Sequence, residues 1–418
     1  MIQIRSEAVS PQLAEWLGKI NTLDPSRIEL GLARVNAVLP RLGIDRDMLT
    51  ISVAGTNGKG SSVHLLDSLL RACGHRVGRY TSPHLSRFNE RIAIDDEPVS
   101  DSELVRAFET VAKAQLDTPL TYFEFTTLAA LVVFSRAGVA AQVLEVGLGG
   151  RLDAVNAVIP DACLLTGVDY DHQKWLGNTL EAIGREKAGI FRASVPAVVA
   201  MPNPPRSVAE TAQAISADLW QADTDFTVVE GYYRGRDRKL KLPESNDLVQ
   251  LQLLAGVLAV LESLGLLVRI DTDDIQSALR APVPARLELI TREREVLLDV
   301  AHNPQSIDRL VAWLEAHPAP RGNTLVMGVM RDKPVARLVE RLAPVIHRWV
   351  AVAADLERAM ASTELASIMA QVVGAPALVG GSPVAGFRSA AKLTPQDGRI
   401  IVAGSFPVVG AIRAALYF

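Results

Sequence analysis

The chain has 418 residues, which is too long for one ordinary hydrophobic core and indicates two to three domains. Hydrophobic residues make up 49% and charged residues 22%, a balance typical of a folded globular protein and not of a disordered one. The formal net charge of −4 gives no general attraction for nucleic acid, so local groups must hold any polyanionic ligand.

The cysteine content and the apolar stretches indicate a cellular compartment. Two cysteines, Cys73 and Cys163, exclude a disulfide framework and a cysteine-based zinc site, and they suit a reducing cytosol. The first residues lack an uninterrupted apolar run, which argues against a signal peptide. The most apolar stretch, residues 251–268, includes Gln252 and Glu262 and therefore predicts a core helix, not a membrane span. We expect a cytoplasmic protein without membrane contact.

The first half of the chain alternates β-rich runs with helical patterns. A β-branched run at residues 49–54 precedes a glycine-rich turn and a helix at 61–72, and residues 76–80 read as the next strand. This βαβ unit implies a parallel sheet, with further buried strands at 142–146 and 162–166. Ahead of them, an apolar stripe at helical spacing predicts an amphipathic helix: Ile28, Leu32, Val35, Leu39 and Leu42.

A second alternating series follows the break at Pro282-Val-Pro284. Strands are expected at residues 296–300, 324–328, 349–352 and 399–403, with helices between them. We therefore place a domain boundary near residue 284 and expect two α/β domains joined by a proline-containing hinge.

The turn after the first strand carries a phosphate-binding signal, Gly55-Thr-Asn-Gly-Lys-Gly-Ser61. A glycine turn lets backbone N–H groups approach phosphate oxygens, while the helix N-terminus and Lys59 add positive charge. The strict Walker pattern is not met, because Val53 occupies its first glycine position and Gly60 separates Lys59 from Ser61. A tight turn with an exposed lysine is the alternative, but the strand before and the helix after favour phosphate binding.

Metal-capable side chains follow three of the predicted strands: Ser82, Glu145 and His172. Ligands gather beyond the carboxyl ends of parallel strands, so these residues can converge near the phosphate loop. Oxygen ligands suit Mg²⁺, whereas the histidine indicates a second site. Each alone could be a turn residue, a strand-end charge or a loop histidine, but their shared placement favours metal binding.

Seven motifs occur in order along the chain: Gly-Thr-Asn-Gly-Lys-Gly-Ser, Thr-Ser-Pro-His-Leu, Tyr-Phe-Glu-Phe-Thr-Thr, Leu-Glu-Val-Gly-Leu-Gly-Gly-Arg-Leu-Asp-Ala, Asp-His-Gln-Lys-Trp-Leu-Gly, Gly-Arg-Glu-Lys-Ala-Gly-Ile-Phe-Arg and Asp-Val-Ala-His-Asn-Pro. On these motifs the chain resembles the folylpolyglutamate synthases, and among them the bacterial bifunctional dihydrofolate synthase/folylpolyglutamate synthases, which are relatives of the Mur ligases. The likeness extends from about residue 20 to about residue 410.

The resemblance implies an ATP-dependent amide ligase. ATP would phosphorylate a carboxylate, and the amino group of L-glutamate would attack the acyl phosphate. The acceptors would be 7,8-dihydropteroate, giving dihydrofolate, and folates, giving polyglutamates. The implied fold is α/β: a Mur-ligase-like P-loop ATPase domain at residues 1–284 with a parallel-rich sheet, binding ATP, Mg²⁺ and pterin, and a smaller Rossmann-like α/β ligase domain at 285–418. We expect a monomer, because no heptad seam or interface signature stands out.

The resemblance also implies roles for individual residues. Lys59, Lys187 and His302 would be catalytic, with Lys187 carbamylated and His302 near the transferring phosphate. Ser82 and Glu145 would hold one Mg²⁺, and Glu145 would be shared with a second Mg²⁺ bound by His172. The residues that match ATP-binding positions are Thr56, Asn57, Gly58, Lys59, Gly60, Ser61, Arg286 and Asp299. Without the resemblance, Lys187 would read as a solvated helix lysine, Arg286 as part of a surface ion pair and His302 as a helix cap.

The pterin would be met by a loop at residues 121–124 and by residues 152–154. An aromatic face can stack on the flat bicycle, and the Asp153 carboxylate can pair with its N–H donors. Core packing is the alternative for Phe123. The segment around Gly31 resembles the dihydropteroate-binding segment of the bifunctional enzymes and is the main reason to expect both activities. The pterin-binding residues are thus Gly31, Thr121, Tyr122, Phe123, Glu124, Leu152, Asp153 and Ala154.

Two departures from the family pattern affect substrate detail. The usual adenine-contacting Asn-Ala-Ala segment is replaced by residues 251–255, where Gln252 is a candidate substitute. The usual Gly-Ser-Phe-His ends in Pro407, which cannot supply a histidine's hydrogen bond. The alternatives are a monofunctional folylpolyglutamate synthase, a Mur-type ligase acting on a cell-wall precursor, and a non-catalytic nucleotide switch.

Overall fold

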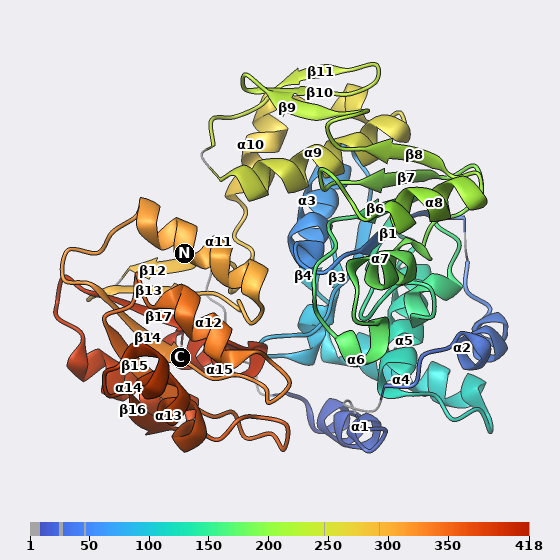
Figure 1. Ribbon diagram of the computed structural model, residues 1–418. Helices are drawn as coiled ribbons and strands as arrows, with labels where there is room; N and C mark the ends of the chain where they lie inside the picture. The colour runs from blue at the N-terminus through green and yellow to red at the C-terminus, as the bar shows by residue number, and fades with distance from the viewer. Residues whose placement is uncertain (1–8, 25–27, 46, 246, 292, 418) are drawn as a thin grey trace. The chain divides into compact units, whose positions relative to one another are not determined.

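The computed structural model describes residues 9–24, 28–45, 47–245, 247–291 and 293–417. Its described residues group into two compact units (Figure 1). The larger unit contains residues 9–82 and 88–281, and the smaller unit contains residues 83–87 and 282–417. The chain thus passes into the smaller unit after Ala281, beside the proline pair of the sequence.

The larger unit is built on a sheet that has eight strands within the described residues, in the order β4–β3–β2–β5–β1–β6–β7–β8. From β2 to β8 neighbouring strands are parallel, whereas β3 and β4 pair antiparallel at one edge. The strands are β1 Leu49–Ala54, β2 Val77–Tyr80, β3 Ile92–Ile94, β4 Glu97–Pro98, β5 Ala141–Glu145, β6 Ala162–Leu165, β7 Pro196–Val199 and β8 Asp218–Gln221. A separate antiparallel sheet contains β9 Thr227–Val229, β10 Tyr232–Arg234 and β11 Lys239–Lys241.

Helices cover both faces of the large sheet. Successive strand residues point to opposite faces, so Val143 packs in one core with α3 and α9, while Leu144 packs in the other with α4 and α5. The helices are α1 Pro11–Asn21, α2 Ala33–Val38, α3 Lys59–Ala72, α4 Asp101–Gln115, α5 Tyr122–Ala137, α6 Gln173–Leu176, α7 Leu180–Ala188, α8 Arg206–Ala214, α9 Leu248–Ser263 and α10 Thr272–Arg280. Short 3₁₀ turns are η1 Leu39–Leu42, η2 Phe88–Arg91, η3 Ala154–Ala157 and η4 Leu267–Arg269.

In the part of the smaller unit that is described, one sheet has the strand order β12–β13–β17–β14–β15–β16. All neighbours are parallel except the β12–β13 hairpin. Ile401 packs with α11, α12 and α13 on one face, and Ile400 packs with α14 and α15 on the other. The elements are β12 Glu288–Thr291, β13 Glu295–Leu298, α11 Pro304–Ala316, β14 Asn323–Met327, α12 Val335–Leu342, β15 Arg348–Val352, α13 Ser362–Val373, β16 Leu378–Gly381, α14 Pro383–Leu393, β17 Arg399–Ala403 and α15 Phe406–Tyr417.

The predicted α/β fold class is confirmed, and most predicted strands lie within one or two residues of the observed ones. The helix expected over residues 28–42 is wrong at both ends. Only Ala33–Val38 is α-helical, since Gly31 N donates to Leu152 O (3.1 Å) in place of joining the helix. Pro40 lacks an N–H group, and the chain tightens there into the 3₁₀ turn η1.

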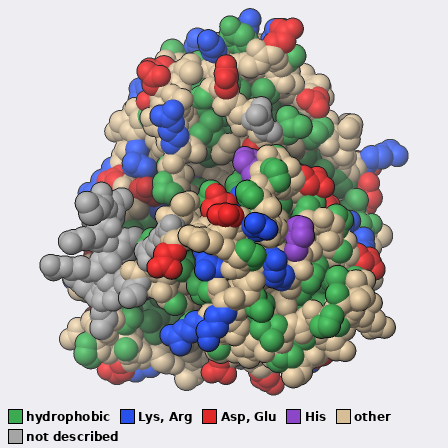
Figure 2. All heavy atoms as spheres, turned by 90° about the vertical axis from the view of Figure 1, so that its left-hand side faces the viewer, with side chains coloured by type: hydrophobic (Ala, Val, Ile, Leu, Met, Phe, Trp, Pro, Cys, Tyr) green, Lys and Arg blue, Asp and Glu red, His purple; other side chains and the backbone are tan. Residues whose placement is uncertain are grey.

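The apolar stretch at residues 251–268 is a core helix as predicted, but only as far as Ser263. Gly265 then adopts a left-handed conformation (φ 71°), which ends the helix, and Leu267–Arg269 form a 3₁₀ turn. In the described part of the chain, no helix has both the length and the apolar character that crossing a bilayer requires. Figure 2 shows basic and acidic side chains interspersed over the displayed face, without one continuous basic field.

Candidate active site

A glycine loop between β1 and α3 forms the start of the site. Gly58 is the N-cap of α3 and has a φ of 84°, which favours glycine. At Gly55, a Cβ atom would clash with the Thr166 hydroxyl, and φ is 154°. The loop therefore depends on glycine at both positions, and it leads directly into a helix N-terminus of the kind that binds phosphates.

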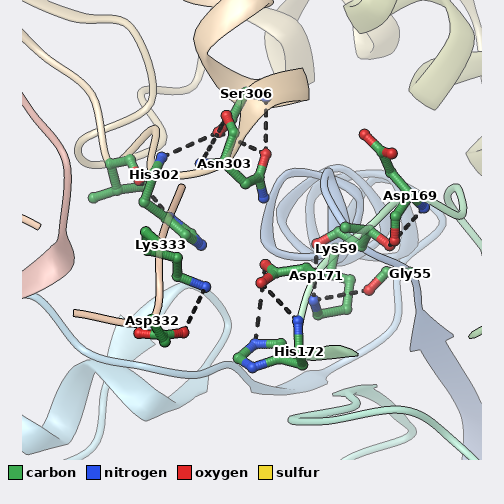
Figure 3. A network of polar contacts seen from close by, with 12 residues as sticks. Gly55, Lys59, Asp169, Asp171, His172, His302, Asn303, Ser306, Asp332 and Lys333 are labelled. Carbon is green, nitrogen blue, oxygen red and sulfur yellow. Dashed lines mark hydrogen bonds and ion pairs between the residues drawn. The ribbon is translucent and has the colours of Figure 1, made fainter. Parts of the chain in front are cut away.

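The segment that follows β6 clamps this loop. Thr56 N donates to Gly167 O (2.9 Å), and the Thr166 hydroxyl donates to Asn57 O (2.6 Å). The Thr56 hydroxyl donates to Asp169 O (3.1 Å) and accepts from Asp169 N (2.9 Å). Asp169 is labelled in Figure 3. These hydrogen bonds fix the conformation of the glycine loop. Sequence reasoning missed Thr166 and Asp169, because no sequence motif indicates that residues following β6 contact the glycine loop that follows β1.

Two lysine amines converge on the carbonyl oxygen of Gly55. Lys59 Nζ donates to Gly55 O (3.0 Å) and Thr56 O (3.4 Å), and Lys187 Nζ also donates to Gly55 O (3.0 Å). Lys187 is only 4% exposed, so the alternative of a solvated helix lysine is wrong. Burial, and next the positive charge of Lys59, lower the pKa of Lys187 to about 7. A fraction of this amine is therefore neutral near pH 7.

The adjacent parallel strands β2 and β5 bring Ser82 and Glu145 together. Glu145 is the buried last residue of β5, and its Oε2 accepts from Ser82 N (3.2 Å). A hydroxyl and a carboxylate at this edge form a donor set that fits Mg²⁺. His172 follows β6 as the N-cap of α6, with a φ of 50° and a side chain 43% exposed. Its N–H donates to Asp171 Oδ1 (2.9 Å; Figure 3). Across the described residues, no three His, Cys, Asp or Glu side chains form a complete metal-ligand cluster.

The residues expected to bind pterin, 121–124, form the N-cap and start of helix α5, so their assignment to a loop is wrong. Thr121 is the N-cap: its hydroxyl accepts from Glu124 N (3.3 Å), and the Glu124 carboxylate accepts from Thr121 N (2.7 Å). This reciprocal capping box could have been read from Thr-x-x-Glu. Arg34 Nε also donates to Glu124 Oε2 (2.9 Å), a partner that sequence reasoning missed. Tyr122 is buried, with its ring 5.5 Å from the Arg91 guanidinium.

The other expected pterin residues gather around residues 147–154. The Phe123 ring packs against Gly147, where a Cβ would collide with it, and lies 6.0 Å from the Tyr80 ring. Asp153, the N-cap of η3, accepts from Leu148 N (2.9 Å) and Val155 N (3.0 Å). Burial raises the pKa of Asp153 to about 7. The hydrogen bond from Gly31 to Leu152 brings the N-terminal segment to the same place, and Ala154 begins the buried turn η3.

Gln252 lies on α9, and its Nε2 donates to Ala200 O (2.7 Å), just after β7. The side chain is therefore tied to the sheet of the larger unit.

The smaller unit contains the other predicted ATP-contacting residues. Asp299 is buried: Oδ2 accepts from Leu287 N (2.8 Å) and Oδ1 from Ala301 N (2.8 Å). Burial raises the pKa of Asp299, and the Arg286 charge opposes this rise. The Arg286 guanidinium lies 5.7 Å from the Phe406 ring. His302 Nδ1 donates to Val300 O (2.8 Å).

The cap of helix α11 is Asn303, not His302, so the alternative of His302 as a helix cap is wrong. Asn303 Oδ1 accepts from Ser306 N (3.0 Å), and Ser306 Oγ accepts from both Asn303 N and His302 N (Figure 3). This network fixes the backbone on which the His302 imidazole is carried.

Comparisons with known proteins identify the family of this chain. Residues 285–406 match the family model of the Mur ligase glutamate ligase domain. The dihydrofolate synthase/folylpolyglutamate synthase of Escherichia coli (strain K12) is 38% identical over 361 residues, which cover 84% of this chain and 83% of that protein. The chain belongs to the dihydrofolate synthase/folylpolyglutamate synthase family. The family resemblance in the sequence motifs is thereby confirmed.

Solved structures of this family share the fold. E. coli FolC in complex with DHPP and ADP has a TM-score of 0.90 and 32% identity, covering 98% of this chain and 99% of that one. A bifunctional folylpolyglutamate synthase/dihydrofolate synthase with Mn, AMPPNP and L-glutamate bound has a TM-score of 0.89 and 35% identity, covering 99% and 100%. The expected combination of a nucleotide-binding α/β region with a C-terminal α/β ligase region is therefore confirmed.

Proposed function

We propose that this chain is an ATP-dependent ligase that joins L-glutamate to 7,8-dihydropteroate, giving dihydrofolate, and to folates, giving polyglutamates. The observation that carries the proposal is the rigid glycine loop at residues 55–58, with the Lys59 and Lys187 amines on its first carbonyl. Family membership and the ADP, AMPPNP, Mn and L-glutamate of the related structures support the same activity.

The chemistry requires activation of a carboxylate. A carboxylate oxygen attacks the γ-phosphorus of ATP, ADP leaves, and an acyl phosphate forms. The amino nitrogen of L-glutamate then attacks the acyl carbon, phosphate leaves with the carboxylate oxygen, and the nitrogen loses a proton. The α3 N-terminus and Lys59 neutralise the phosphate charge that develops, so the protein contributes mainly positioning and electrostatic stabilisation. Thr56, Asn57, Gly58, Gly60 and Ser61 complete the proposed phosphate site.

Ser82 and Glu145 would hold Mg²⁺, because the Glu145 carboxylate lies 3.2 Å from the Ser82 backbone nitrogen and a hydroxyl and a carboxylate suit this ion. A second Mg²⁺, shared by Glu145 and His172, is part of the proposal. When bound, the metal would supply positive charge to the phosphates. Carbamylation of Lys187 is also proposed, since a buried amine with a pKa near 7 can attack CO₂ and release a proton to give a carbamate. That group would add negative charge near the proposed metal site.

The remaining roles follow the family motifs. Arg286 would contact the phosphates, Asp299 the ribose and Gln252 the adenine, while His302 would lie near the transferred phosphate. The pterin would stack on Phe123 beside Asp153. Residues 1–284 would thus bind ATP, Mg²⁺ and pterin, and residues 285–418 would complete the ligase, in a cytoplasmic monomer.

The test offers the purified protein ATP, Mg²⁺ and L-glutamate with either dihydropteroate or tetrahydrofolate, and mass spectrometry detects the amide products. We expect product from both acceptors. Product from tetrahydrofolate alone would indicate a monofunctional folylpolyglutamate synthase. ATP hydrolysis without any amide product would contradict the ligase assignment.

The same assay tests the role of Lys59 through the substitution Lys59→Ala. This substitution should reduce turnover at least about a hundredfold, as expected for loss of a transition-state charge contact. The thermal midpoint should change little, because Lys59 is not a core residue.

A further inference from the structure

The residues on either side of Arg286 have an unusual backbone conformation. Ala285 has a φ of 55° and Leu287 a φ of 50°, both in the left-handed region that residues other than glycine rarely adopt. Such conformations persist only where the surrounding structure holds them, and they concentrate at functional sites. The turn at residues 285–287 therefore requires specific partners.

Two carboxylates hold this turn. Ala285 N donates to Glu288 Oε2 (2.8 Å), and Leu287 N donates to Asp299 Oδ2 (2.8 Å). Val300 N also donates to Ala285 O (3.0 Å), and the Ala285 methyl group is fully buried. The backbone is thus fixed on both sides of Arg286.

Glu288 is itself held by helix α15. Arg413 Nε donates to both of its carboxylate oxygens (2.9 and 3.1 Å), and the Tyr417 hydroxyl donates to Oε1 (2.9 Å). The two side chains of the ion pair are mostly buried, at 10% exposed for Glu288 and 18% for Arg413. Glu288 therefore transmits the position of α15 to the backbone of the turn.

The same helix also contacts Arg286 directly. Phe406, the first residue of α15, lies with its ring 5.7 Å from the Arg286 guanidinium. One end of α15 thus meets the Arg286 side chain, and the other end holds its backbone through Glu288. Glu288 is thus bonded both to the turn, through Ala285 N, and to helix α15, through Arg413 and Tyr417.

We propose that Glu288 is a positioning residue for ATP: through Ala285 it fixes the turn that orients Arg286. The inference rests on the proposed function, because it takes Arg286 to contact the ATP phosphates.

The test is a double-mutant cycle of Glu288→Ala and Arg286→Ala, with KM and kcat measured separately for ATP, L-glutamate and the acceptor. Glu288→Ala should raise the KM for ATP about tenfold, the size expected for loss of a hydrogen bond to a charged group. The KM for L-glutamate should stay unchanged. In the Arg286→Ala background, Glu288→Ala should have little further effect, since residues that act through one another are not additive.

Two further variants separate positioning from general destabilisation. Glu295→Ala removes a comparable carboxylate–arginine pair with Arg399 (2.8 Å) at the other end of the β12–β13 hairpin, and it should leave the KM for ATP unchanged. Glu288→Gln keeps an acceptor for Ala285 N and should raise this KM only about threefold. If Glu288→Ala does not fold, as judged by circular dichroism, Glu288→Gln carries the same cycle.

The outcomes distinguish the two proposals. If Arg286→Ala raises the KM for ATP but the Glu288 variants do not, or their effect adds to it, the positioning role is wrong and the ligase assignment stands. If Arg286→Ala leaves this KM unchanged, both the phosphate role of Arg286 and the positioning role of Glu288 are wrong.

Discussion

Lys187 and Lys59 contact the same carbonyl oxygen but differ in burial and therefore in protonation. Both amines donate to Gly55 O, but Lys187 is buried whereas Lys59 is half-exposed. A buried amine next to a positive charge loses its proton more readily. We therefore expect Lys59 to remain the cation of the loop and Lys187 to supply a reactive neutral amine.

This difference predicts a carbamate on Lys187. In ¹³CO₂ at constant partial pressure, NMR should detect a carbamate resonance that increases between pH 6 and pH 8. The increase follows because a pKa of about 7 makes the amine mostly protonated below this window and mostly neutral above it.

Lys187→Met should abolish the carbamate resonance, whereas Lys174→Met should keep it, since the Lys174 ammonium only lies over the Trp175 ring (5.4 Å). A spectrum without a carbamate at pH 8, or a resonance that survives in Lys187→Met, would contradict the modification.

For single residues, the sequence predicts which side chains carry functional groups better than it predicts their burial and their contact partners. From sequence, the strand-end positions of Ser82 and Glu145 predict that both lie at the carboxyl edge of a parallel sheet, and the family resemblance pairs them. The burial of Lys187 against Gly55 and the pairing of Glu288 with Arg413 could not be predicted, since they depend on contacts between segments far apart in the chain.

Among the elements, the β1–loop–α3 unit requires glycine at defined positions. At Gly55 an added Cβ would clash with Thr166 Oγ1 and lie 3.3 Å from Gly167 N. Gly55→Ala should therefore lower the free energy of unfolding by about 3 kcal/mol, combining overpacking with backbone strain. Turnover should fall at least about tenfold, because the displaced loop misplaces its N–H groups.

Gly74→Ala is the matched control for Gly55→Ala, since Gly74 also has a positive φ (87°) but has open space around its Cβ position. It should cost only about 1 kcal/mol of strain and keep turnover. Chemical denaturation and steady-state kinetics measure both effects. Equal losses in the two variants would mean that the Thr166 clash has no special importance.

The elements that sequence periodicity predicts well are those whose packing is uniform. Buried parallel strands give continuous apolar runs, and most of the predicted strand ranges lie within one or two residues of the observed strands. The prediction is wrong for the helix at residues 28–42, because Gly31 bonds to the distant Leu152, and for the loop at 121–124, because the Thr121 capping box starts a helix there. Apolar spacing alone does not reveal either feature.

At the scale of the whole molecule, the chain passes between the two units after Ser82, Arg87 and Ala281. Residues 83–87 belong to the smaller unit, where a Cβ on Gly410 would collide with the Leu85 carbonyl oxygen. This close approach joins a motif of the first half to helix α15. The spacing of apolar residues does not predict that the chain enters the smaller unit here, because only the short segment 83–87 does so.

The central claim is that the chain joins glutamate to its acceptors through an acyl phosphate, and oxygen transfer tests it most directly. Dihydropteroate labelled with ¹⁸O at both carboxylate oxygens would be converted with ATP and L-glutamate, and the released phosphate analysed by mass spectrometry. We predict that each amide formed transfers one labelled oxygen to inorganic phosphate, because the bond between the acyl carbon and the bridging carboxylate oxygen breaks and this oxygen leaves with the phosphate. Amide formation with unlabelled phosphate would contradict the account.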